Sequence, residues 1–172
     1  MKYLLYLIVL LAAPSAVFSQ DITGLWKGTL YNDSTQQSFQ YEVVVSKDHG
    51  KYSAFSYTWF QEKGSKLYGV KKIKVHVAKD GKIIMQDAEL VKNNYNPDPN
   101  QKIFQLNVLD FADNSGEPTL DGLFVTNRTK AFHEHSGRIT LKRVSAVVQG
   151  DLMENFQLGN SETTTTLTAA VR

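Results

Sequence analysis

Apolar and polar residues alternate along most of the chain after residue 20. In the segment 38–47, Phe39, Tyr41, Val43 and Val45 share one face, and Gln40, Glu42, Val44 and Ser46 share the other. A period of two residues is typical of a half-buried β-strand. Similar patterns predict strands at roughly 22–31, 38–47, 51–60, 67–78, 82–90, 102–111, 119–127 and 137–144.

Turn-forming sequences separate several of these segments. Lys47-Asp48-His49-Gly50 predicts a tight hairpin, and Lys79-Asp80-Gly81 predicts another. An apolar face opposite a polar face favours an antiparallel sheet with one side in water. Consecutive strands joined mostly by short turns predict an all-β, eight-stranded, up-and-down antiparallel barrel. A β-sandwich is the alternative architecture.

The N-terminal segment has the pattern of a secretory signal peptide. A positively charged start at Lys2 precedes an apolar run from Tyr3 to Ala13, which Pro14 ends before small residues follow. We therefore predict a signal peptide at 1–20, a barrel domain at 21–145, and a C-terminal extension at 146–172 that is partly mobile or caps one end. The predicted location is outside the cytoplasm, periplasmic or secreted, and a bacterial source is favoured.

Composition excludes several classes of function. The chain has no cysteine, so it has neither disulfides nor a thiol nucleophile. Its formal net charge is +2, which gives no general attraction to nucleic acid. No second apolar segment approaches the length of a membrane span. The predicted partner is therefore a small molecule or a protein surface, and the oligomeric state stays open.

One short motif suggests a family. Gly24-Leu25-Trp26 lies on the first predicted strand, and Ile139 and Leu141 share a face with Arg143 on the last. Glycine leaves room beside a large indole, and an arginine on an apolar face needs a partner such as an aromatic ring. This arrangement resembles the first signature of the lipocalins and their calycin relatives.

The resemblance implies that Gly24, Trp26 and Arg143 are structural, with Trp26 packed inward at the closed end of the barrel beneath Arg143. Leu109-Asp110-Phe111 stands where the family has a second signature, Thr-Asp-Tyr, and retains the Asp alone. The disulfide that is usual in the family is missing. Avidin-like and fatty-acid-binding-like barrels fit the same pattern.

Aromatic residues concentrate between Tyr52 and Phe60. Eight-stranded barrels are able to hold a small ligand, and ligand pockets are mostly apolar and aromatic. The predicted ligand-binding residues are Phe55, Tyr57, Trp59, Tyr68 and Phe104. The alternative is that these aromatic side chains fill the core.

The other polar clusters are predicted to be exposed to solvent. His133-Glu134-His135 has no evident third ligand, so we predict a solvated loop rather than a metal site. Asp87 and Glu89 are expected on the solvent face of a strand. The lysines at 71, 72, 74, 79 and 82 are expected to keep an exposed face soluble, or to meet an anionic surface. We predict no cofactor.

Together these features predict an exported, lipocalin-like protein that binds a small apolar or amphipathic ligand without catalysis. One alternative is a protein-interaction or inhibitor module with a filled barrel. Another is a small barrel enzyme, an isomerase or hydrolase. No nucleophile elbow, phosphate-binding glycine loop or zinc-protease motif supports the enzyme.

Overall fold

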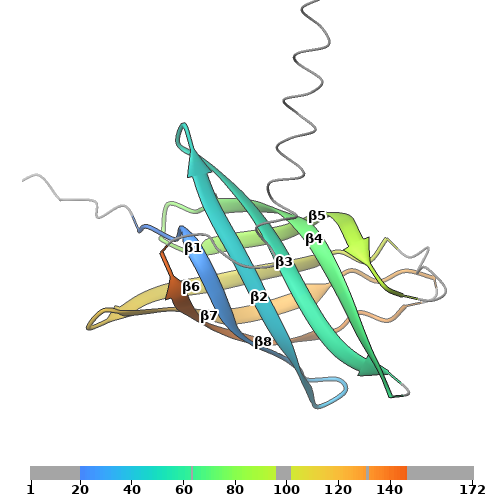
Figure 1. The fold of residues 1–172 in the computed structure, drawn as a ribbon. Coiled ribbons are helices and arrows are strands. Elements are labelled where there is room, and N and C mark those ends of the chain that lie inside the picture. The colour runs from blue at the N-terminus through green and yellow to red at the C-terminus, as the bar shows by residue number, and fades with distance from the viewer. Residues whose placement is uncertain (1–19, 63, 96–101, 131, 147–172) are drawn as a thin grey trace, which may run out of the picture.

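Eight antiparallel strands close into a barrel in the order of the sequence, as Figure 1 shows. The computed structural model describes residues 20–62, 64–95, 102–130 and 132–146. The strands are β1 (Gly24–Asn32), β2 (Gln37–Asp48), β3 (Lys51–Glu62), β4 (Ser65–Val77), β5 (Ile83–Asn93), β6 (Gln105–Asn114), β7 (Glu117–Thr126) and β8 (Ser136–Ser145). The predicted up-and-down barrel is confirmed, and the β-sandwich alternative is wrong. The predicted signal peptide and C-terminal extension lie almost entirely outside the described residues.

Strand alternation sorts apolar side chains into an interior cluster and an outer one. Val43 and Val45 of β2 belong to the interior cluster, which draws on all eight strands. Val44, between them, belongs to a second cluster with Leu25, Phe55 and Val70, from β1 to β4. Because neighbouring residues of a strand point to opposite faces, this second cluster lies on the outer face of the barrel.

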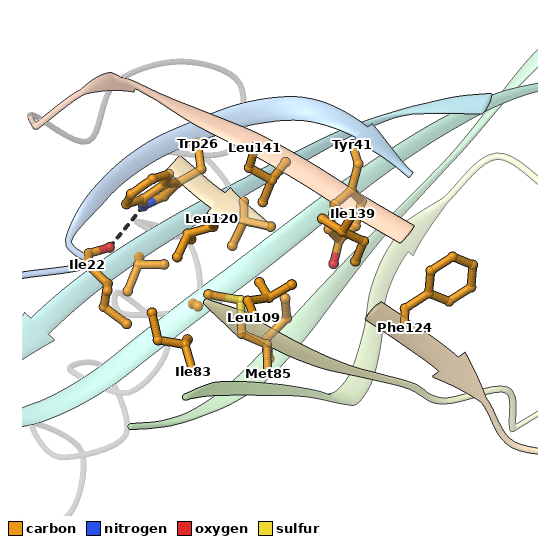
Figure 2. Close-up of a cluster of buried hydrophobic side chains, with 14 of the residues drawn as sticks. Ile22, Trp26, Tyr41, Ile83, Met85, Leu109, Leu120, Phe124, Ile139 and Leu141 are labelled. Carbon is orange, nitrogen blue, oxygen red and sulfur yellow. Dashed lines mark hydrogen bonds between the residues drawn. The ribbon is translucent and has the colours of Figure 1, made fainter. Parts of the chain in front are cut away.

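Trp26 anchors one end of the interior, which Figure 2 shows in close-up. Its side chain is fully buried, and its indole N–H donates a hydrogen bond of 2.9 Å to the carbonyl of Ile22. The guanidinium carbon of Arg143 lies 5.0 Å from the Trp26 ring centroid, and Arg143 Nη2 donates to the carbonyl of Asp21. These two hydrogen bonds hold the segment that precedes β1 against side chains of β1 and β8.

Gly28 allows β1 and β8 to approach closely beside Trp26. A Cβ atom at this position would lie 1.9 Å from the carbonyl oxygen of Thr140, far inside van der Waals contact. Gly28 pairs with Leu141 on β8 and with Tyr41 on β2. A side chain here would therefore force apart β1 and β8, the first and last strands of the barrel.

Within the described residues, the structure contains no helix with the length and apolar character needed to cross a membrane.

Replacing Trp26 with Ala is expected to lower the free energy of unfolding by about 3–5 kcal/mol, because it leaves a large cavity in the interior. Denaturant melts measure the change. Trp59→Ala is the matched control, since Trp59 is the other tryptophan and is half-buried near the opposite end. A loss below about 1 kcal/mol for Trp26→Ala would contradict its placement as an interior anchor.

Candidate functional site

The interior becomes polar towards the end of the barrel opposite Trp26. Ser56, Asp87 and Asn107 are all buried, and Tyr41 is 2% exposed. Register places Ser56 opposite both Val43 and Lys71, so the Lys71 side chain also points inward. Polar groups removed from water need hydrogen-bond partners, and these residues supply them to one another.

Of the two acidic residues on β5, Asp87 enters the barrel and Glu89 does not. The pairing of β5 with β4 shifts between Lys72 and Ile73 and again between Val70 and Lys71. Asp87 lies opposite Ile73 on the inner face, whereas Glu89 lies opposite Lys72 on the outer face. Asp87 continues the inward alternation of Ile83 and Met85, which belong to the interior cluster. The bulge that follows Asp87 reverses this alternation, so Glu89 points outward. The prediction that Asp87 faces solvent is therefore wrong, and so is the prediction that Lys71 lies on an exposed face.

Asp87 and Lys71 close the gap that opens between β5 and β6. The backbone ladder between these strands runs from Ile83↔Leu109 to Gln86↔Leu106. Beyond it, Asp87 Oδ2 accepts the backbone N–H of Gln105 at 2.9 Å and the Lys71 ammonium at 2.5 Å. Lys71 Nζ also donates to the carbonyl of Ile103 at 3.3 Å. Two side chains thus replace backbone pairing at this seam.

A chain of hydrogen bonds runs from this seam across the interior. The Gln105 side-chain amide donates to Asn107 Oδ1 at 2.8 Å, and Asn107 Nδ2 donates to the Tyr41 hydroxyl at 3.3 Å. Tyr41 is also hydrogen-bonded to Ser56. The chain connects β6 to β2 and β3 across the barrel. It fixes the orientation of several polar groups below the end of the barrel opposite Trp26, which we call the open end.

Burial governs the titration of this region. Burial raises the pKa of Asp87, while the charge and hydrogen bond of Lys71 and the Gln105 N–H act in the opposite direction. Burial, and then the nearby charge of Asp87, raise the pKa of Tyr95 to about 12. The same two causes raise the pKa of Tyr41. Both tyrosines therefore keep their hydroxyl protons at neutral pH and remain hydrogen-bond donors.

Aromatic rings form a layer above the polar groups. Phe39 meets Phe60 edge-on at 6.3 Å between centroids, and Phe60 meets Tyr95 at 5.6 Å. The Tyr95 hydroxyl occupies the space over Gly69, where a Cβ atom would lie 2.2 Å from its oxygen. Gly69 therefore makes room for Tyr95 at the open end.

A cleft of about 650 Å³ opens beside this aromatic layer. It lies where β2 and β3 diverge, because their backbone ladder ends at Gln40↔Trp59. The lining combines three aromatic side chains with three amides, a hydroxyl and an ammonium: Phe39, Trp59, Phe60, Gln37, Gln40, Gln61, Ser38 and Lys66. This volume is within the range of small-molecule sites, which also combine aromatic walls with a few polar groups.

The residues predicted to bind a ligand fall in different places. Phe55, Tyr57 and Tyr68 belong to the outer apolar cluster. Trp59 lines the cleft, and its ring lies 3.8 Å from that of Tyr57. Phe104 is half-buried, and its backbone N–H donates to Asn127 Oδ1 at 2.7 Å. A ligand-binding role for these five residues stays a prediction, but the structure does not bring them together in the interior.

Two asparagines shape the open end in a way that the sequence did not suggest. Asn94 Oδ1 accepts the backbone N–H of Tyr68, and its Nδ2 donates to the carbonyl of Lys66. Asn127 makes the same pair of bonds to Phe104 and Lys102. An amide side chain carries both a donor and an acceptor, so it can stand in for a neighbouring backbone. These bonds hold the loops at the end of the barrel opposite Trp26.

The histidine cluster lies before β8. His133 and Glu134 are exposed, and His135 packs edge-on against Phe132. Among the described residues, no group of three metal-ligating side chains is positioned to hold an ion.

Asp87 gives a testable pH dependence. Its raised pKa means that the native state holds this proton up to a higher pH than the unfolded chain, in which an Asp carboxyl has a pKa of about 3.9. Between the two pKa values, stability falls as pH rises. The free energy of unfolding of the wild type, minus that of Asp87→Asn, should therefore decrease from about pH 4 upwards and then level off.

Urea melts across this pH range measure that difference. Asp110→Asn is the matched control, because Asp110 is an exposed carboxylate in an ion pair with Lys82 and should contribute little. A difference between wild type and Asp87→Asn that stays flat, or grows with pH, would contradict the burial of this carboxyl.

Comparisons with protein-family models, with curated proteins and with solved structures give no match for this chain.

Proposed function

We propose that this protein binds a small amphipathic molecule at the open end of the barrel, without catalysis. The observation that carries the proposal is the cleft of about 650 Å³ with its aromatic and amide lining. The rings of Phe39, Trp59 and Phe60 offer apolar contact, and Gln37, Gln40 and Gln61 offer both donors and acceptors. A purely apolar ligand would leave these amides unpaired, so an amphipathic ligand fits better.

The polar interior supports binding rather than catalysis. Asp87 has the raised pKa that is common at catalytic sites, but structural ion pairs show the same property. One of its oxygens is occupied by Lys71 and by the Gln105 N–H, which are the contacts that close the barrel. Asp87 also does not line the cleft. We therefore assign it to the scaffold of a lipocalin-like binding protein.

The proposal includes export from the cytoplasm. It is supported by the signal-peptide pattern of residues 1–20 and by the absence of cysteine, which fits a bacterial exported protein better than a small eukaryotic secreted one.

The fluorescent probe anilinonaphthalene sulfonate tests the site, because it is amphipathic and carries an aromatic body. Replacing Trp59 with Ala should weaken probe binding about tenfold, since this ring forms part of the cleft wall. Leu123→Ala is the control: Leu123 is 61% exposed on β7, away from the cleft. Equal effects of the two substitutions would show that the probe does not use the cleft.

Native mass spectrometry of the protein purified from its own host complements this titration. A co-purified small molecule that Trp59→Ala loses and Leu123→Ala retains is the expected result. Absence of any bound molecule, together with no probe binding in the cleft, would overturn the proposed function.

A further inference from the structure

A notch separates β3 from β4 near the Trp26 end of the barrel. Backbone pairing between these strands begins at Ala54↔Ile73, so residues 51–53 and 74–77 face each other without a ladder. Residues 51–53 pair with β2 on their other side, and 74–77 pair with β5. Each segment is thus a regular strand with one edge unpaired. In Figure 1 the β2–β3 hairpin projects beyond the rest of the barrel at this end.

The notch has an apolar floor and a basic rim. Its volume is about 540 Å³. Tyr52, Val75 and Val77 line the floor and pack against the interior cluster. The alternate residues point outward and are exposed at the rim: Lys51, Lys72, Lys74 and His76. The two kinds of side chain alternate along β4, because successive residues of a strand point to opposite faces.

The basic rim lacks ion-pair partners. Elsewhere on the barrel, Lys27 is paired with Glu42 and Lys82 with Asp110. Among the described residues, no carboxylate lies within ion-pair distance of the three rim lysines or of His76. The acidic residues opposite them in register are Glu89, across from Lys72, and Asp48, across from Lys51. Three lysines against these two carboxylates leave a local excess of positive charge at the rim.

We propose that this notch binds an extended acidic peptide segment of another protein, which adds as a short strand to the free edge of β4. Strand addition satisfies unpaired backbone groups, and pockets for alternate side chains supply specificity. Apolar side chains of the peptide would rest on Tyr52, Val75 and Val77, and its carboxylates would meet the rim lysines. The preferred sequence therefore alternates apolar and acidic residues.

A simple polyanion fits the notch less well than an extended peptide does. A polyanion would use the basic rim but leave both strand edges and the apolar floor unpartnered. Exposed strand edges are normally covered or blocked by charge, and here the lysines discourage pairing with a copy of the same basic edge. The site is separate from the small-molecule cleft, which lies between β2 and β3 at the opposite end.

The test uses a fluorescently labelled synthetic peptide in which valine and glutamate alternate, titrated into the full chain at low salt. Three comparison peptides isolate the proposed contacts. One has the same composition with the valines and glutamates in separate blocks, one replaces glutamate with lysine, and one is N-methylated at alternate amides. Oligoglutamate serves as the polyanion.

The alternating peptide should bind, and each of the four other probes should bind at least about tenfold more weakly. The double substitution Lys72→Glu with Lys74→Glu should weaken binding by at least about tenfold, whereas Lys92→Glu, an exposed lysine on β5, should have little effect. The substituted positions are exposed, and thermal melts check that the variants remain folded.

Several results would overturn the proposal. Equal binding of the N-methylated peptide would exclude strand addition, and equal binding of oligoglutamate would indicate a general anion surface. Failure of the alternating peptide to bind at about 1 mM would exclude a specific site. Because the probe for the open-end cleft is different, none of these results bears on the proposed function.

Discussion

The closure of the barrel between β5 and β6 depends on a buried carboxylate. The two strands share a short ladder, and Asp87 and Lys71 continue it with side-chain bonds to the backbone of Gln105 and Ile103. Breaking one partner of a buried ion pair leaves an uncompensated charge, which is strongly destabilising. The inward position of Asp87, in alternation with Ile83 and Met85, therefore matters to the whole fold as well as to one strand.

The interior side chains form three levels along the barrel. Trp26 and the surrounding aliphatic side chains pack one end, the polar chain from Asp87 to Tyr41 crosses the middle, and Phe39, Phe60 and Tyr95 gather at the other end. Asn94 and Asn127 fasten the loops around that end. The cleft lies at this end, where β2 and β3 diverge. Most of its wall belongs to these two strands, and sites built on strands are held more precisely than sites on loops.

Period-two alternation was enough to predict the number, order and approximate bounds of the strands, because a sheet with one face in water imposes that pattern. It did not decide the placement of every charged residue. Asp87 follows the alternation of Ile83 and Met85 into the barrel, although its charge favoured a solvent-facing prediction. Glu89 faces outward because a bulge follows Asp87, and no local signal marks that bulge. Val44 and Phe55 are apolar on the outer face, so composition alone could not say which face of β3 enters the barrel. The cleft and the notch depend on where ladders end, which is a property of register between strands.

Hydrogen exchange at the backbone amide of Gln105, followed by NMR, tests the central claim most directly. The account predicts that this amide is protected to a degree similar to the ladder residues of β6, and that Asp87→Ala removes its protection while Val108 on the same strand keeps its own. Rapid exchange of Gln105 in the wild type, or unchanged protection in Asp87→Ala, would contradict closure of the barrel by the Asp87 carboxylate.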